Sequence, residues 1–174
     1  DHCDRAPELE ERLLASGKKE VYDEVVNLAH LANITYICQK ETRGLGHAIS
    51  CAKAFVGDEP FAVLYGDDVI LGEDPACGQL IRAYNETGKG VVGVKEVSEE
   101  AIQRYSSLKV EPLHDNWFTC TDMIEKPSKD KIMSLYSILG RCVLPPQIFD
   151  ILAHTAPGAG GEIQLTEFAL THSS

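Results

Sequence analysis

Phe61-Ala62-Val63-Leu64-Tyr65-Gly66-Asp67-Asp68 is a short, continuous apolar run that ends in a glycine and two acids. Because its apolar residues do not alternate with polar ones, and because Pro60 precedes them, the run predicts a strand covered on both faces, as in a parallel sheet. Ligands of open α/β sheets gather at the carboxyl ends of the strands. Asp67 and Asp68 therefore stand where a ligand or a cation is expected.

The sequence around this run predicts an alternation of strands and helices. Ile34–Cys38 and Val91–Val94 have the composition of further strands. Helical spacing of apolar residues appears in Pro7–Ala15, Leu45–Phe55 and Cys77–Tyr84. Such alternation indicates βαβ units, which build an open sheet with helices on both faces. The predicted fold class is α/β and Rossmann-like, with a mixed but mostly parallel sheet.

The second half of the chain has a different pattern. Leu108–Glu111 and Phe118–Ile124 resemble strands, and His114-Asp115-Asn116 between them predicts a hairpin turn. Ser137–Leu144 is a further predicted strand, which Pro145-Pro146 ends. Two helices complete the prediction, one through Phe149, Ile151 and Leu152 and one over 162–172. No segment has the composition of a linker, so one compact unit is expected.

Composition excludes several classes of protein. The 174 residues carry a formal net charge of −11, which argues against a nucleic-acid partner. No apolar run approaches the roughly 20 residues that span a bilayer, and no signal-peptide pattern opens the sequence. The six cysteines are scattered and have no zinc-like spacing, as expected of small thiols in a reducing compartment. These features predict a cytoplasmic protein without a membrane partner.

The segment Gln39-Lys40-Glu41-Thr42-Arg43-Gly44-Leu45-Gly46-His47-Ala48 follows a predicted strand and opens a predicted helix. Glycines at such a junction allow a ligand to approach the backbone closely. The Gln39 amide offers one acceptor and two donors, which is enough to read the edge of a base. The alternative is an ordinary tight turn between strand and helix.

Two further segments carry charged residues at the ends of predicted strands. Asp67 and Asp68 could bind Mg²⁺, which takes one or two carboxylates and completes its octahedron with water and phosphate oxygens; the alternative is a solvated turn. In Met123–Pro127, Glu125 can accept hydrogen bonds from sugar hydroxyls and Lys126 can neutralise a phosphate. The alternative there is an exposed ion pair without a function.

Six segments in a fixed order make a more specific pattern than any one of them. They are Gln39–Ala48, Leu64–Asp68, Val92–Val94, Ile124–Pro127, Leu139–Arg141 and Gly160–Thr166. Together they resemble the sugar-1-phosphate nucleotidylyltransferase family. Their spacing and their particular residues resemble its glucose-1-phosphate uridylyltransferase branch. The resemblance extends over nearly the whole chain.

The resemblance implies a reaction in which the phosphate of glucose 1-phosphate attacks the α-phosphate of UTP, giving UDP-glucose and pyrophosphate with Mg²⁺ as cofactor. It also implies roles for individual residues. Gln39 and Gly44 would bind the nucleotide; Gly93, Glu125 and Ile138 would bind the sugar; Asp67 and Lys126 would be catalytic; and Asp67, with Asp68 as the alternative, would bind the metal.

The sequence also departs from the family pattern. It contains neither the Gly-rich loop with Arg and Lys that grips the triphosphate in that family, nor the later segment with a second metal-binding acid. The expectation is therefore one partial domain over residues 1–174, truncated at both ends, that catalyses poorly or not at all alone. The resemblance allows for a homo-oligomer of the complete protein.

Three alternatives remain open from the residues. One is a thymidylyl- or cytidylyl-transferring relative, because Gln39 alone does not separate the pyrimidine bases. Another is a non-catalytic module that binds a sugar nucleotide. The third is an α/β domain with an unrelated ligand at its strand ends.

Overall fold

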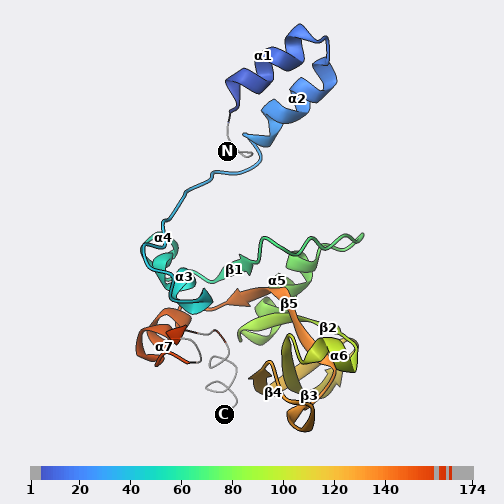
Figure 1. Cartoon of the computed structure of the whole chain (residues 1–174), viewed down its shortest axis with the longest axis vertical. Helices are drawn as coiled ribbons and strands as arrows, with labels where there is room; N and C mark the ends of the chain where they lie inside the picture. Colours follow the sequence, from blue (N-terminus) through green and yellow to red (C-terminus); the bar gives the residue numbers. More distant parts are fainter. Residues whose placement is uncertain (1–4, 159–160, 164, 166–174) are drawn as a thin grey trace. The chain divides into compact units, whose positions relative to one another are not determined.

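The computed structural model describes residues 5–158, 161–163 and 165 (Figure 1). Contacts within the chain divide it into two compact units, residues 1–38 and 39–174, which are described separately here. The expectation of one domain over 1–174 stays a prediction. Among the described residues, no helix is long and apolar enough to cross a membrane.

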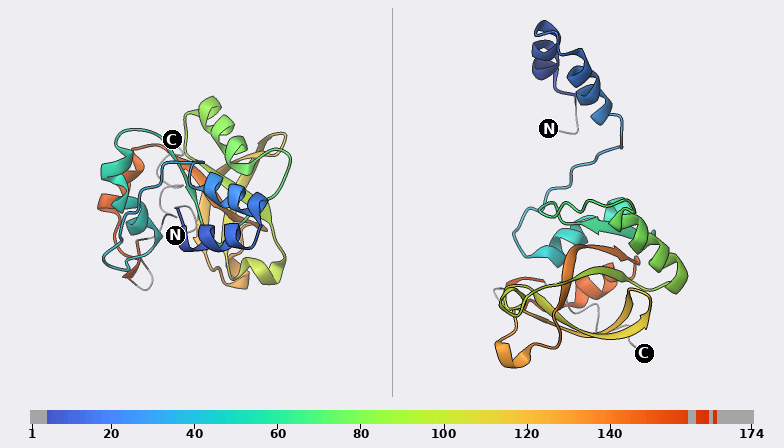
Figure 2. Two further views of the ribbon diagram at one scale, coloured as in Figure 1. Left: turned by 90° about the horizontal axis from the view of Figure 1, so that it is seen from above. Right: turned by 90° about the vertical axis from the view of Figure 1, so that its right-hand side faces the viewer.

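The first unit is a pair of helices joined by a short turn, which Figures 1 and 2 show side by side. Helix α1 spans Pro7–Ala15, the same bounds that the sequence predicts, and begins with proline where a backbone N–H is not needed. Helix α2 spans Lys19–Leu28 and was not predicted. Gly17 has φ +71° in the turn between them, a conformation that glycine adopts at little cost.

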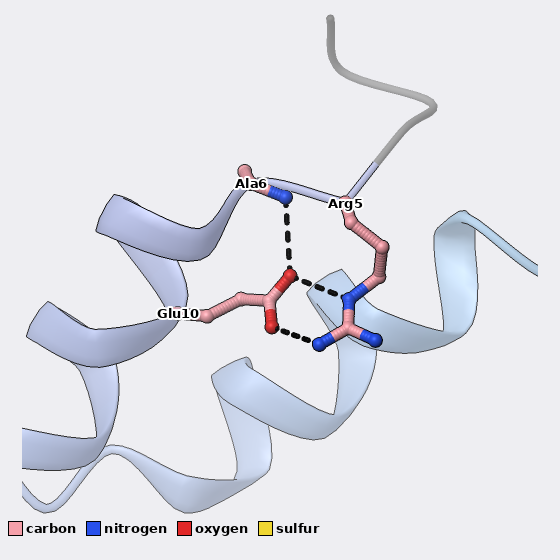
Figure 3. A network of polar contacts seen from close by, with 3 residues as sticks. All are labelled: Arg5, Ala6 and Glu10. Atoms are coloured by element: carbon pink, nitrogen blue, oxygen red, sulfur yellow. Dashed lines mark hydrogen bonds and ion pairs between the residues drawn. The ribbon is translucent and has the colours of Figure 1, made fainter.

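A three-residue network closes the start of α1 (Figure 3). The Arg5 guanidinium donates from Nε and Nη2 to the two carboxylate oxygens of Glu10, at 2.8 and 2.5 Å. The backbone N–H of Ala6 donates to Glu10 Oε1 at 3.1 Å. Hydrogen bonds from Arg5 hold the pKa of Glu10 below its ordinary value, although burial of the carboxyl opposes the shift. The ionised carboxylate therefore ties the chain before α1 to the first turn of the helix.

The predicted strand Ile34–Cys38 is wrong. Residues 33–38 have no regular secondary structure, and their side chains are exposed. No strand in the described part of the chain pairs with them. A β-branched, aromatic run has strand propensity, but a strand forms only where a partner takes its backbone hydrogen bonds.

The second unit contains a three-stranded sheet in the order β1-β5-β2. Strand β1 is Phe61–Leu64, β2 is Val91–Glu96 and β5 is Tyr136–Leu144, which lies between the other two (Figures 1 and 2). Both pairings are antiparallel, so β1 and β2 run in the same direction without pairing with each other. The predicted α/β class is confirmed, but parallel pairing is not what these strands show. Ala62 and Leu64 of β1 are exposed, so the prediction that this run is covered on both faces is wrong. A short apolar run therefore shows neither that both faces of a strand are buried nor in which direction its neighbour runs.

Helices cover this sheet. The predicted helix Leu45–Phe55 is two helices, α3 (Leu45–Cys51) and α4 (Lys53–Val56), that meet at Ala52. Helix α5 (Ala76–Thr87) packs against β2 and β5, and α3 packs against α7 (Ile148–His154). The buried core joins β5 to α3 and α7; its members are Ile49, Cys142, Leu144, Ile148, Phe149, Leu152 and Ile163.

A β-hairpin is attached to the sheet through serines. Its strands are β3 (Ser106–His114) and β4 (Trp117–Glu125), joined at the predicted turn, where Asp115 has φ +48°. The Oγ of Ser107 donates to the carbonyl of Ser134, just before β5, at 2.8 Å. A short helix α6 (Glu99–Ile102) precedes the hairpin and the 3₁₀ turn η1 (Lys129–Lys131) follows it. Most of the helix predicted over 162–172 lies outside the described residues.

Candidate functional site

Strand β5 brings the predicted site residues of the second unit together. Leu64, the last residue of β1, pairs with Arg141, so the acids after β1 lie beside the middle of β5. Glu125, the last residue of β4, pairs with Ser106. The Oγ of Ser106 lies 3.4 Å from Ser137 Oγ and accepts from the backbone N–H of Ile138 at 3.4 Å. The ends of β1 and β4 are thus both attached to β5, within a few residues of each other.

Gly140 makes room for the Asp68 carboxylate. The backbone N–H of Tyr65 donates to the Gly140 carbonyl at 2.7 Å. Gly140 is buried with φ +54°, and a Cβ added there would lie 2.6 Å from Asp68 Oδ2. No other residue fits this position without displacing the Asp68 carboxylate. Asp68 is half-buried against β5, whereas Asp67 is exposed.

Arg141 fixes the same loop from the strand side. Its Nη2 donates to the backbone carbonyl of Asp68 at 3.1 Å. Its Nη1 is buried without a hydrogen-bond partner among the described residues. A buried donor without a partner is costly. The hydrogen bond from Nη2 to the Asp68 carbonyl is the contact by which Arg141 holds the loop that carries the two acids. Arg141 lies in one of the six segments named in the sequence analysis, but its residue type and position gave no physical reason to single it out.

Glu125 and Lys126 end β4 in an unusual conformation. Both side chains are exposed. Lys126 has φ +46°, which is uncommon for a residue other than glycine. Its backbone N–H donates to the Tyr105 carbonyl at 2.8 Å, and Pro127, which follows, is buried. The local backbone is therefore held by contacts on both sides of Lys126, which fixes the direction in which the chain leaves the strand.

Tyr65 links the two groups of acids. Burial raises the pKa of its phenol well above the ordinary value, and Cys142, Glu125 and Asp67 add smaller contributions in the same direction. Since the charges of Glu125 and Asp67 both act on this phenol, the two carboxylates share one neighbourhood. Tyr65 was read from the sequence as a strand residue only, because an aromatic at the end of an apolar run gives no signal of a site.

Gly93 and Ile138 lie where β2 meets β5. The register shifts here, since Val92 pairs with Cys142 but Val94 pairs with Ile138. A Cβ added at Gly93 would lie 3.5 Å from the Arg141 carbonyl and 3.8 Å from Leu80 Cδ1, in ordinary contact. Gly93 and Ile138 are both half-buried. A backbone contact between Gly93 and a sugar, and a sugar contact of Ile138, stay predictions.

The glycines of the Gln39–Ala48 segment accommodate the chain itself. A Cβ on Gly44, which has φ +87°, would lie 2.8 Å from Glu162 Cβ, and one on Gly46 would lie 2.8 Å from the Ile163 carbonyl. The backbone N–H of Gly46 donates to Ile163 O at 2.8 Å, and that of Ile163 donates to Arg43 O at 2.9 Å. The close approach that these glycines permit is therefore made by residues 162–163. A nucleotide contact of Gly44 stays a prediction.

Gln39 is held by this segment. Its Nε2 donates to the Gly44 carbonyl at 3.1 Å and lies 2.9 Å from His47 Nδ1. Both side chains are half-buried. The amide that was predicted to bind the nucleotide thus has a fixed place beside the start of α3, and His47, which has no role in the sequence-based prediction, takes part in fixing it.

The acids suit a hard cation that brings its own water and phosphate ligands. Within residues 5–158, 161–163 and 165, no group of three or more His, Cys, Asp and Glu side chains could enclose a metal ion. Mg²⁺ does not need such a cage, because it is commonly bound by one or two carboxylates and substrate phosphates. Asp67, exposed beside the half-buried Asp68, fits this donor set.

Comparison with known proteins identifies the family. The profile of the nucleotidyl transferase family matches residues 5–170. UTP–glucose-1-phosphate uridylyltransferase 2 of Staphylococcus saprophyticus is 48% identical over 167 residues, which are 96% of this chain and 58% of that protein. The chain thus spans less than two thirds of that relative's length. The chain belongs to the nucleotidyl transferase family.

Solved structures agree with the fold. Apo UDP-glucose pyrophosphorylase superimposes with a TM-score of 0.88 at 32% identity, over 98% of this chain and 63% of that one. A UDP-glucose pyrophosphorylase complexed with UDP-glucose superimposes with a TM-score of 0.84 at 32% identity, over 98% of this chain and 62% of that one. The mixed α/β architecture described above is therefore that of the UDP-glucose pyrophosphorylases.

Proposed function

We propose, from membership of the nucleotidyl transferase family, that this chain is the part of a UTP–glucose-1-phosphate uridylyltransferase that holds the uridine base, the glucose and a Mg²⁺ ion. The observation that carries the proposal is the attachment of two strand ends to β5. One brings Asp67 and Asp68 beside Gly140 and Arg141, and the other brings Glu125 and Lys126 beside Ser137 and Ile138. The relatives and solved structures named above support the same substrates.

The chemistry needs positioning and charge neutralisation more than covalent help from the protein. Glu125 would accept hydrogen bonds from glucose hydroxyls, and Lys126 would neutralise the phosphate of glucose 1-phosphate. Asp67, with Asp68 as the alternative, would hold the cation. Mg²⁺ bound there would neutralise charge on the phosphate oxygens of UTP. Gly140 and Arg141 would keep the loop that carries both acids in place.

Cytoplasmic location is part of the proposal. Cys38, Cys51, Cys77, Cys120 and Cys142 are free thiols in the described chain, as is usual in a reducing compartment. UTP and glucose 1-phosphate are the proposed small-molecule partners. A homo-oligomer of the complete protein stays a prediction.

The test is calorimetric titration of the chain with UDP-glucose and Mg²⁺. Replacing Glu125 by Gln is expected to weaken UDP-glucose binding by about tenfold or more, since hydrogen bonds to a charged group contribute roughly 1.5–3 kcal/mol. Asp67→Asn is expected to abolish the effect of Mg²⁺ on binding. In the complete protein, the same variants are expected to slow pyrophosphate release from UTP and glucose 1-phosphate.

Matched controls come from exposed acids of the same unit. Glu111→Gln changes an exposed acid of β3, and Asp115→Asn changes the turn of the hairpin, where Asn also tolerates a positive φ. Both controls are expected to bind UDP-glucose like the parent chain. Absence of UDP-glucose binding, or equal losses in the controls, would contradict the proposed function.

A further inference from the structure

The orientation of the Gln39 amide is set by two acceptors of the chain itself. The carboxamide nitrogen Nε2 carries two N–H groups. One faces the Gly44 carbonyl at 3.1 Å and the other faces His47 Nδ1 at 2.9 Å. Turning the amide over would place Oε1 against the Gly44 oxygen, which cannot donate. The two acceptors therefore define which end of Gln39 faces away from α3.

This arrangement also defines the state of His47. A neutral imidazole has one donor and one acceptor nitrogen, and the tautomer follows from the partners. Because Nδ1 faces an amide N–H, it must be the acceptor, so the ring proton lies on Nε2. The Gly44 carbonyl is present whatever residue occupies position 47, whereas the second acceptor is supplied only by the histidine side chain.

The amide oxygen of Gln39, Oε1, is free to accept a hydrogen bond from a ligand. In the described part of the chain no group donates to Gln39 Oε1, so it can accept a hydrogen bond from a base. Uracil carries an N–H at N3, and in the same pose cytosine would present an unprotonated N3. A fixed oxygen accepts from the first and repels the second, whereas a freely turning amide could serve both. Specificity of this kind needs a rigid repulsive element as well as an attractive one.

We propose that His47 is a positioning residue that locks Gln39 with its amide oxygen toward the base, so that the site prefers uridine to cytidine nucleotides. The proposal rests on the proposed function and on the predicted contact of Gln39 with the nucleotide. It goes beyond that function because it assigns base discrimination to the pair of residues rather than to Gln39 alone.

The first test compares the dissociation constants of UDP-glucose and CDP-glucose, which differ only in the base, by titration calorimetry on the chain. His47→Leu is expected to reduce the preference for UDP-glucose at least about fivefold, because one amide N–H loses its acceptor. His47→Asn is expected to restore most of the preference, since its Oδ1 can take the place of Nδ1.

A matched control is His154→Leu. His154 is an exposed histidine of α7 whose Nδ1 also makes a hydrogen bond, to the Asp150 carbonyl at 2.7 Å. Its replacement is expected to leave both dissociation constants unchanged. Circular dichroism checks that each variant folds, and His47→Ala replaces the leucine variant if that one does not.

The second test needs no ligand. Nitrogen-15 NMR of the imidazole is expected to show His47 with the proton on Nε2, and a proton on Nδ1 in the neutral ring would overturn the proposal. An unchanged preference in His47→Leu, or an equal loss of both ligands, would overturn it while leaving the proposed function in place. If the parent chain binds neither nucleotide sugar, the proposed function fails, and this inference fails with it.

Discussion

Asp115 and Lys126 are the two non-glycine residues with positive φ in the described chain. Asp115 lies in a two-residue hairpin turn, where aspartate adopts this conformation at modest cost. Lys126 follows a strand, and its conformation is imposed by the hydrogen bond to Tyr105 and by the buried Pro127. Strain of this kind is retained at sites where the direction of a side chain matters.

The strain at Lys126 predicts opposite effects on stability and binding. Lys126→Gly is expected to stabilise the chain by ~1 kcal/mol, because glycine adopts a positive φ without strain. The same variant is expected to bind UDP-glucose more weakly, because the positive charge is lost. Denaturant unfolding and titration calorimetry measure the two effects.

Asp115→Gly is the control for this pair of measurements, because it changes the other strained residue at a distance in sequence from the charged site. It should give a smaller gain in stability, because aspartate adopts a positive φ at modest cost, and binding should be unchanged. A Lys126→Gly variant that binds normally would remove Lys126 from the site.

At the scale of single residues, the sequence predicts those whose chemistry is unusual for their position. Asp67, Asp68, Glu125 and Lys126 stand out because charges follow directly after strands. His47, Tyr65 and Arg141 could not be singled out in the same way. Their importance comes from neighbours that are distant in sequence, such as the Asp68 carbonyl for Arg141, and only the fold brings such partners together.

Two helical glycines of the second unit have opposite surroundings. In α3, a Cβ on Gly46 would lie 2.8 Å from Ile163 O and 2.9 Å from Leu152 Cδ2. In α5, a Cβ on Gly78 would meet only the flexible end of Arg82, at 3.5 Å. The first is a packing requirement between elements, and the second is a position where alanine would favour the helix.

Alanine substitutions test this contrast. Gly46→Ala is expected to lower the free energy of unfolding by about 2 kcal/mol through overpacking. Gly78→Ala is expected to raise it by roughly 0.5–1 kcal/mol, because alanine loses less backbone entropy in a helix. Chemical denaturation of both variants measures the difference, and equal effects would refute the close packing of α3 against Ile163.

The ion pair at the start of α1 predicts a pH dependence of the first unit. Since the pKa of Glu10 is lowered in the folded chain, its contribution to stability is complete above the unfolded value of about 4.3 and is lost as the pH falls through the lower folded pKa. Amide chemical shifts of residues 7–15 are expected to show the start of α1 fraying in that acidic range.

Glu10→Gln provides the comparison, because it removes the charge at every pH. The variant should fray at neutral pH already and show little further change on acidification. Glu11→Gln, an exposed neighbour in the same helix, should behave like the parent chain. Identical pH profiles of the parent and Glu10→Gln chains would contradict the role of the ion pair.

At the scale of elements, cap and turn residues in the sequence predicted where helices and strands lie. The pairing of strands, which depends on contacts between distant residues, was not predicted. Helix α1 has a proline at its start and a glycine after its end, and the sequence predicts it residue for residue. The hairpin and β5 are also predicted, from a turn signal and a terminating proline pair, but with shorter strands than the structure has. The pairing of β1 and β2 with β5 was not, because partners and direction depend on tertiary contacts that a short apolar run does not encode.

At the scale of the molecule, hydrogen bonding is distributed unevenly. Strand β5 is bonded on both edges, and Cys142, Val143 and Leu144 are buried. Residues 33–38 are exposed and outside any described strand or helix. Regions of this kind open with very different free energies.

Hydrogen exchange followed by mass spectrometry measures this difference. Amides of 33–38 are expected to exchange near their intrinsic rates, and those of β5 only on global unfolding of the second unit. Protection of 33–38 comparable to that of β5 would show that the predicted strand at Ile34–Cys38 forms after all.

The central position of β5 has a consequence for synthesis on the ribosome. Strands β1 and β2 both pair with β5, residues 136–144, which is translated after the other two strands. Until β5 emerges, the backbone edges of β1 and β2 have no native partner. Nascent chains with unpaired strand edges are prone to associate wrongly. The order of translation therefore leaves β1 and β2 unpaired until β5 has been made, and slower decoding before residue 136 would prolong that exposure.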